Sequence, residues 1–307
     1  MPASDRFRGC LLGLATGDAV GTTVEFRPRG SFAPLTDMVG GGPFRLQPGQ
    51  WTDDTSMALC LATSLVECGG FDARDQMERY CRWAETGYLS STGTCFDIGG
   101  TVSAALHRFR QTGEPFAGSR DPHSAGNGCI MRLAPVPLFY YPDIAAAEAF
   151  AAESSRTTHG AEECVDASRL LARMLVRALA GQSKEAIAFG DSEGFSGSPK
   201  IVAIARGEYR RKTEVEIKGS GYVVASLEAA LWCFIRTETF RDAVLLAANL
   251  GDDADTTAAI CGQLAGAFYD ESGIPEAWLE RLTMRQEIGG LAERLTAHGS
   301  TGSPLES

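Results

Sequence analysis

The sequence predicts an all-α protein. Apolar and small residues recur at helical spacing through most of the 307 residues, as they do in helices that bury one face. Alternation of apolar and polar residues, the mark of a half-buried strand, is scarce. The apolar segments 201–204 and 215–217 are too short to tell a strand from a loop. No repeat or linker divides the chain, so we expect one mostly helical domain over residues 1–295 and a polar, disordered tail over 296–307.

The first expected helix covers residues 7–20, which are dominated by apolar and small side chains. Residues 27–50 are rich in Gly and Pro and predict a long loop. Further helices are expected over 72–86, 99–111, 144–153, 161–181, 222–236, 240–248 and 253–269, with a Gly/Ser-rich loop over 190–200.

The helix after the long loop has a clear start signal. Thr52 suits the N-cap position, and Asp53 and Asp54 then fall in the first turn, where negative charge is favoured. This helix is expected to continue to about Cys68 and to end at the glycine pair that follows.

Composition restricts the class of protein. The net charge of −11 argues against nucleic acid as a partner, although a small phosphate-bearing ligand remains compatible with it. No apolar run approaches the roughly 20 residues that span a bilayer, and the first residues do not resemble a secretion signal. The nine cysteines are scattered without a C-x-x-C pair, which is typical of reduced core thiols in a cytoplasmic protein.

Two acidic segments, Thr52–Thr55 and Asp252–Thr257, each precede an apolar stretch that is expected to form a buried helix. Carboxylate and hydroxyl oxygens suit hard cations such as magnesium, manganese or calcium. Two facing pairs of carboxylates could hold a dinuclear centre, with ions about 3.5–4 Å apart. The alternative is that both segments are ordinary acidic first turns. Small residues after the second segment, including Gly262 and Gly266, would let the helix there pack closely against another helix. The second segment would then be buried, which favours a metal site over an ordinary acidic first turn.

Other features indicate a ligand with phosphates. Gly126-Asn127-Gly128 is a glycine-flanked loop, and Gly99-Gly100-Thr101 opens an expected helix. Backbone N–H groups at such places bind anions, although plain turns are the alternative for both. Three side chains are further candidates, each with a structural alternative as a cap, surface or core residue: His123, His159 at a possible helix start, and Tyr222, which could stack on a base.

Taken in order, these segments resemble the ADP-ribosylglycohydrolase family. The matching stretches extend over most of the chain and are Arg8–Gly21, Val24–Phe26, Trp51–Thr55, Phe96–Gly99, Gly126–Arg132, Thr158–Gly160, Gly221–Val224 and Asn249–Thr256. The resemblance implies a compact orthogonal bundle of helices with two divalent cations, Mg²⁺ or Mn²⁺. By the same resemblance, the metal ligands would be Thr52, Asp53, Asp54, Asp253, Asp255 and Thr256.

The resemblance also implies roles in substrate binding and catalysis. Asp97 and Glu25 match acidic residues that act on substrate or on the water to be activated. The groups expected to bind substrate are Gly99, Gly100, Thr101, His123, Asn127, Gly128, His159 and Tyr222. One departure is Asp252, which stands where the family commonly has glycine and is expected to add a charge beside the metals.

The implied reaction is metal-dependent removal of ADP-ribose from a modified partner. The segment around Asp97 favours the N-glycosidic bond of ADP-ribosylated arginine on a protein. Serine-linked ADP-ribose, O-acetyl-ADP-ribose and ADP-ribosylated small molecules remain alternatives. Two other classes also remain: a relative that binds ADP-ribose without hydrolysing it, and a metal-dependent phosphoesterase, which would cut ADP-ribose to AMP.

Overall fold

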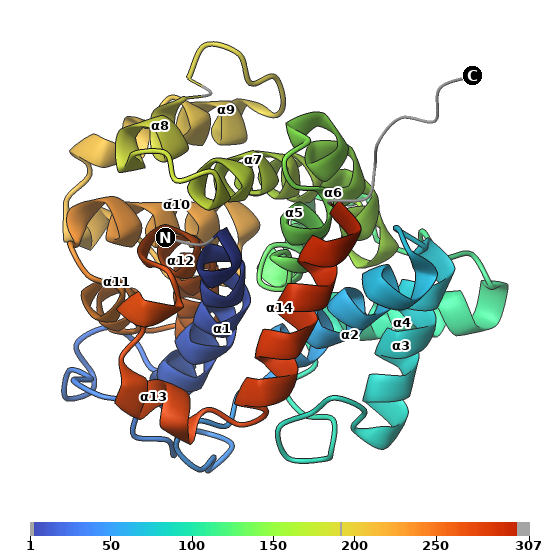
Figure 1. Cartoon of the computed structure of the whole chain (residues 1–307), viewed down its shortest axis with the longest axis horizontal. Coiled ribbons are helices and arrows are strands. Elements are labelled where there is room, and N and C mark those ends of the chain that lie inside the picture. Colours follow the sequence, from blue (N-terminus) through green and yellow to red (C-terminus); the bar gives the residue numbers. More distant parts are fainter. Residues whose placement is uncertain (1–2, 191, 300–307) are drawn as a thin grey trace.

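The computed structural model describes residues 3–190 and 192–299, and helices make up its framework (Figure 1). The α-helices of this part of the chain are α1 (Ala3–Gly21), α2 (Asp53–Cys68), α3 (Ala73–Thr86), α4 (Gly100–Thr112), α5 (Pro135–Tyr140), α6 (Ile144–Thr158), α7 (Glu162–Leu179), α8 (Lys184–Phe189), α9 (Pro199–Ala205), α10 (Val223–Arg236), α11 (Phe240–Ala248), α12 (Ala254–Tyr269), α13 (Glu276–Arg281) and α14 (Arg285–Gly299).

Short 3-10 turns connect several of these helices. They are η1 (Thr22–Val24), η2 (Pro122–Ser124), η3 (Asn127–Cys129), η4 (Glu208–Arg211), η5 (Glu214–Glu216) and η6 (Glu271–Gly273). Within the described ranges only isolated β-bridges occur and no strand forms. The predicted all-α class is therefore confirmed.

Three local predictions need correction. Residues 201–204, for which the sequence left strand and loop open, lie in the helix α9. This helix begins at Pro199, so it also includes the end of the expected loop 190–200. Residues 215–217 belong mostly to the 3-10 turn η5. A run of only three or four apolar residues fits either type of element, so its periodicity carries little information.

The end of the domain also differs from the prediction. Helix α14 continues to Gly299, beyond the expected start of the tail at residue 296. Its buried side chains, Ile288, Leu291, Ala292 and Leu295, follow the spacing of one helix face. The remaining part of the predicted tail, 300–307, lies outside the described residues.

The helices gather around one large core with a smaller one beside it. Helices α2, α3 and α4 lie together on one side of the molecule, and α8 to α11 lie on the other (Figure 1). The smaller core includes Met57, Tyr80, Trp83, Val102 and Phe109 and fills the space between α2, α3 and α4. All nine cysteines are free, and seven of them are buried. Among the described residues no helix has the length and apolar character that a membrane span requires.

The closest helix pair is α1 with α12, and glycines make their approach possible. A Cβ placed on Gly13 would lie 2.3 Å from the carbonyl oxygen of Gly262, and one on Gly17 would lie 2.2 Å from that of Ala258. The glycines of α1 recur at every fourth position, which is one face of a helix: Gly9, Gly13, Gly17 and Gly21. The backbones are therefore in direct contact along the whole length of the pair.

The first prediction concerns this contact. We expect Gly13→Ala to lower the free energy of unfolding by about 1–3 kcal/mol or more, because its methyl group would overlap backbone that cannot rotate away. Gly290→Ala is the matched control, since a Cβ there meets nothing within 4 Å in the middle of α14. That change should be neutral or stabilising, by up to about 1 kcal/mol. Urea unfolding of both variants measures the difference, and equal stabilities would contradict the proposed packing constraint.

Candidate active site

The two acidic segments lie side by side, because α2 and α12 begin at the same place in the molecule. Thr256 Oγ1 donates a hydrogen bond to Asp54 Oδ1 at 3.2 Å. Thr52 Oγ1 lies 3.4 Å from Asp255 Oδ2. The sequence predicted that these segments could face each other, and in the structure they do.

Asp18 of α1 holds the start of α2 in place. Its carboxylate accepts hydrogen bonds from the backbone N–H and the hydroxyl of Thr52, at 2.9 Å each, and from those of Thr55, at 3.1 and 2.6 Å. Thr52 precedes the helix as predicted, but its side chain makes no capping bond. Asp18 is thus the cap of α2, supplied from another helix. The sequence signal that could have revealed it is a lone charge within the small, apolar face of α1.

Three carboxyl groups that are not among the predicted metal ligands, those of Asp18, Glu25 and Asp97, lie beside the predicted ligand Asp255. One oxygen each of Glu25, Asp97 and Asp255 lies within 4.8 Å of the other two. Asp18, Asp54 and Asp255 form a second trio of the same size. Asp255 belongs to both trios, so it stands between two groups of carboxylate oxygens.

Burial makes the ionised forms of these acids unfavourable. It raises the pKa of Glu25 to about 9, with the charge of Asp97 adding to the effect. It raises the pKa of Asp97 to about 7, with a further contribution from Asp18. Burial also holds the pKa well above the usual range in a further set: Asp53, Asp54 and Asp255. Without a nearby positive charge these carboxyls cannot all be ionised at neutral pH.

The donor set fits hard divalent cations. Glu25 Oε2 and Asp54 Oδ2 are buried and have no hydrogen-bond partner. Among the described residues, neither Lys nor Arg lines the cavity that these acids border. Unpartnered carboxylate oxygens with no neighbouring basic side chain are what a magnesium or manganese site requires.

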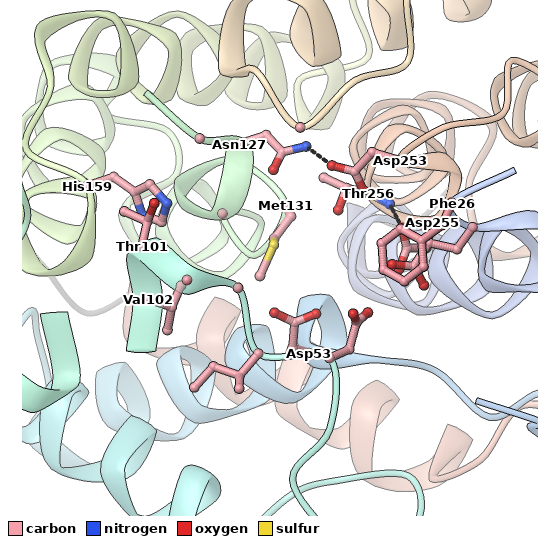
Figure 2. Close-up of a pocket in the computed structure, with 18 residues that line it drawn as sticks. Phe26, Asp53, Thr101, Val102, Asn127, Met131, His159, Asp253, Asp255 and Thr256 are labelled. Carbon is pink, nitrogen blue, oxygen red and sulfur yellow. Dashed lines mark hydrogen bonds between the residues drawn. The ribbon is translucent and has the colours of Figure 1, made fainter. Parts of the chain in front are cut away.

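This space, which we call the acidic cavity, has a volume of about 360 Å³. Most of the predicted site residues line it: Glu25, Asp53, Asp97, Gly99, Gly100, Thr101, Asn127, Gly128, His159, Asp253, Asp255 and Thr256. Figure 2 shows Asp253, Asp255 and Thr256 at one end and His159 with Thr101 at the other, while Asp53 points in from α2. Thr52 and Asp54 lie behind the wall at the acidic end, in contact with residues that line it.

Asn127 lines the acidic cavity and is held in place by hydrogen bonds. Its Nδ2 donates hydrogen bonds to Asp253 Oδ2 at 2.8 Å, drawn in Figure 2, and to Ser226 Oγ at 3.2 Å. Its backbone N–H donates to the carbonyl oxygen of Gly221. That N–H is therefore not free for an anion, contrary to the simplest expectation for a glycine-flanked loop. By contrast, the backbone of Gly99 and Gly100 at the start of α4 is exposed.

His159 lies just after the end of α6, where the sequence suggested a helix start. Arg132 donates a 2.6 Å hydrogen bond to Thr158 Oγ1, which lies 2.8 Å from His159 Nδ1. Because an arginine can only donate, the Thr158 hydroxyl accepts from it and keeps a proton that it can donate to Nδ1. When it does so, the neutral imidazole carries its proton on Nε2. Burial, with a contribution from Arg132, lowers the His159 pKa to about 3, which keeps the imidazole neutral at physiological pH.

The Nε2 edge of His159 faces the cavity between two glycines. A Cβ on Gly128 would lie 2.7 Å from Cε1 of the ring, so only glycine leaves room for it.

Arg132 and Thr158 were not singled out as functional residues from the sequence. The available signal was an arginine at the end of an otherwise apolar segment, since arginine is almost never fully buried without a specific partner.

His123 and Tyr222 line a neighbouring hollow, which shares Thr101 and Gly126 with the acidic cavity. The Tyr222 hydroxyl donates to Glu163 Oε2 at 2.5 Å and accepts from Lys200 Nζ at 2.6 Å. Lys200 Nζ also lies 5.1 Å from the centre of the Tyr222 ring. The ring is thus fixed at the edge of the acidic cavity by a pair of charged groups.

Asp252 does not add a charge to the cavity, in contrast to the expectation from the sequence. Its side chain is exposed and is not part of the cavity lining. Its backbone adopts φ 57°, a left-handed conformation that glycine adopts most easily and that aspartate tolerates better than most residues. Its backbone oxygen accepts a 2.7 Å hydrogen bond from the N–H of Phe26, which ties the Glu25 segment to the start of α12.

Comparisons with known proteins identify relatives over the same span. The family model described as ADP-ribosylglycohydrolase matches residues 1–304. The ADP-ribosylarginine hydrolase Tri1 of Serratia proteamaculans is 46% identical over 292 residues, which cover 95% of this chain and 79% of that protein. The ADP-ribosyl-[dinitrogen reductase] glycohydrolase of Rhodospirillum rubrum is 34% identical, with 92% of each chain covered.

A solved structure agrees with these matches. The chain titled "ADP-ribosylglycohydrolase-related protein complex" superimposes with a TM-score of 0.86 and is 44% identical, covering 97% of this chain and 99% of that one. The predicted resemblance and the predicted type of fold are both confirmed. This protein therefore belongs to the ADP-ribosylglycohydrolase family.

Proposed function

We propose that this protein is a metal-dependent hydrolase that removes ADP-ribose from arginine side chains of a modified protein. The observation that carries the proposal is the meeting of Glu25, Asp97 and Asp255 at the acidic end of a cavity. Similarity to proteins named ADP-ribosylarginine hydrolase supports the arginine linkage. ADP-ribosylated small molecules are the alternative kind of substrate.

Two divalent cations, magnesium or manganese, would be held by the predicted ligands, which are Thr52, Asp53, Asp54, Asp253, Asp255 and Thr256. The unpartnered oxygens of Glu25 and Asp54 support this assignment. When bound, such ions lower the pKa of a water molecule and stabilise developing negative charge. Asp18 would position the ligands without binding metal, because four hydrogen bonds from α2 already occupy its oxygens.

Proton transfer would fall to Asp97 and Glu25. Hydrolysis of the N-glycosidic bond adds water at the anomeric carbon and returns a proton to the departing guanidine nitrogen. A leaving-group acid has to hold a proton before it transfers it, and burial raises the pKa of Asp97 in the metal-free protein. Asp97 would supply the leaving-group proton, and Glu25, close to Asp255, would orient the attacking water.

The other end of the cavity would hold the nucleotide. His159 presents an Nε2–H donor there, next to the backbone of Gly126 and Gly128. Gly99, Gly100 and Thr101 offer the exposed start of α4, which favours negative charge such as a diphosphate. Tyr222 would contact the adenine from the adjoining hollow.

The second prediction tests the reaction and the cation ligands. We expect Asp255→Ala to lower release of ADP-ribose from an ADP-ribosylarginine protein by at least about 100-fold, because this residue belongs to both oxygen trios. Asp252→Asn removes a neighbouring charge that lies outside the cavity, tolerates the same left-handed backbone and should act like the wild type. Product analysis with Mn²⁺, with Mg²⁺ and with a chelator gives the rates. Release of AMP, or full activity of the chelated protein, would contradict the proposed reaction.

The third prediction concerns pH. The folded-state pKa values of Asp18, Asp97 and Glu25 are raised to about 6, about 7 and about 9. A carboxyl with a raised pKa stabilises the fold while it is protonated, and this contribution is lost as pH rises through the folded value. The melting temperature of the chelated protein should therefore fall from about pH 4, near the ordinary pKa of these acids, to about pH 9, the folded value of Glu25. Added Mn²⁺ should stabilise the protein more at the upper end of this range.

Thermal melts across that range measure the effect. Asp97→Asn cannot ionise at this position and should show a smaller decline than the wild type. A melting temperature of the chelated wild type that is independent of pH would contradict the electrostatic account.

The fourth prediction concerns the His159 proton. Thr158→Val removes the hydroxyl that donates to Nδ1, so the imidazole no longer has its proton fixed on Nε2. We expect affinity for ADP-ribose to fall about five- to tenfold, as loss of one oriented hydrogen bond implies. Thr158→Ser keeps the hydroxyl and should bind within about twofold of the wild type. Calorimetry gives the affinities, and ¹⁵N NMR of labelled histidine reports the tautomer. Equal binding by the valine variant would contradict the role.

A further inference from the structure

Three phenylalanines from separate loops form a row at the acidic end of the cavity. The ring centres of Phe26 and Phe44 are 6.3 Å apart, and those of Phe44 and Phe96 are 5.2 Å apart. We call this row the phenylalanine rim. Phe26 lines the acidic cavity, and Figure 2 shows it beside Asp255, at the end away from His159.

Two residues of the rim are sequence neighbours of the carboxyls that are proposed to transfer protons. Phe26 follows Glu25 directly, and Phe96 directly precedes Asp97. Phe44 touches both other rings and so bridges the two segments. A group bound against the rim would therefore lie within reach of both carboxyls.

Phe26 is exposed in a way that packing does not explain. Its side chain is 65% exposed, although a large aromatic ring gains most by burial. Its backbone adopts φ 62°, and that of Asp97 adopts φ 61°, both in the left-handed region that bulky residues avoid. A hydrogen bond from Phe26 N–H to the Asp252 carbonyl holds this conformation. Such strain persists where the surrounding structure enforces it, and it is common at ligand sites.

We propose that the phenylalanine rim binds the guanidinium group and adjoining chain of the modified arginine. This inference rests on the proposed function and extends it to the leaving-group side of the same site. The guanidinium is planar and, once protonated, cationic, so it stacks favourably on the face of an aromatic ring. The carboxyl oxygens of Glu25 and Asp97 beside the rim can accept hydrogen bonds from the guanidinium N–H groups, and no basic side chain among the described residues lines the cavity to oppose its charge.

The position of the rim also matches the order of groups in the substrate. His159 and the start of α4, proposed to bind the nucleotide, lie at the opposite end of the cavity (Figure 2). The distal ribose would lie between them and the rim, near Asp253 and Asp255. The arginine attached to that ribose then has to continue past the acids, where Phe26 stands.

The test is steady-state hydrolysis of an ADP-ribosylarginine peptide by Phe26→Ala. We expect KM to rise about 5- to 30-fold, which corresponds to loss of one partly desolvated cation–π contact, with kcat changed less than about twofold. The affinity for free ADP-ribose, measured by calorimetry, should be unchanged because ADP-ribose lacks the guanidinium. Phe26→Trp keeps an aromatic face and should retain the KM of the wild type within about threefold.

Phe116→Ala is the matched control, because Phe116 is also exposed, at 41%, but does not line the cavity. An unchanged KM in Phe26→Ala, with an active wild type, would overturn the rim proposal alone. An equal loss of affinity for free ADP-ribose would also overturn it, since the ring would then serve the nucleotide. A wild type that releases no ADP-ribose from the peptide would overturn the proposed function and, with it, the rim.

Discussion

The backbone contact between α1 and α12 is the constraint on which the site depends. A Cβ on Gly21 would lie 2.4 Å from the carbonyl oxygen of Ala254, which is the first residue of α12. The end of α1 is thereby fixed against the start of α12. Asp18, one turn earlier in α1, then reaches the first turn of α2, and the acids of both segments converge. Small residues thus set the geometry, and the charged residues occupy places that this packing determines.

Much of this architecture could be predicted from the sequence, because long helices have clear periods and ends. The segment from Asp53 to Cys68 carries its start signal in its first turn and its stop signal in the glycines that follow, and the structure has the same limits. Helices of six or seven residues, such as α8 and α9, offer too few turns for a period to emerge. Helix α14 shows the other cause of error, since it was not among the predicted helices and the polar residues from 296 onward predicted a tail where the helix continues to Gly299.

The site was predictable to a similar degree. Acidic residues at the starts of two helices indicated a cation site. For these residues to meet, the two helices only had to begin at the same place in the fold. Contacts across the fold were not predictable, because nothing in the local sequence states that Asp18 caps α2 or that Arg132 reaches Thr158. The orientation of Asp252 could not be predicted either, since its exposure follows from a left-handed backbone and not from its neighbours in sequence.

Arg132 has a consequence for the way in which a ligand can enter. This guanidinium is fully buried behind His159, packs on the Tyr80 ring at 4.7 Å and, among the described residues, has no carboxylate in an ion pair with it. Its charge is therefore only partly balanced locally, and it acts through a medium that screens weakly. Buried acids stand at the other end of the same cavity. The buried charge of Arg132 therefore makes the His159 end of the cavity the favourable place for an anionic group of a ligand.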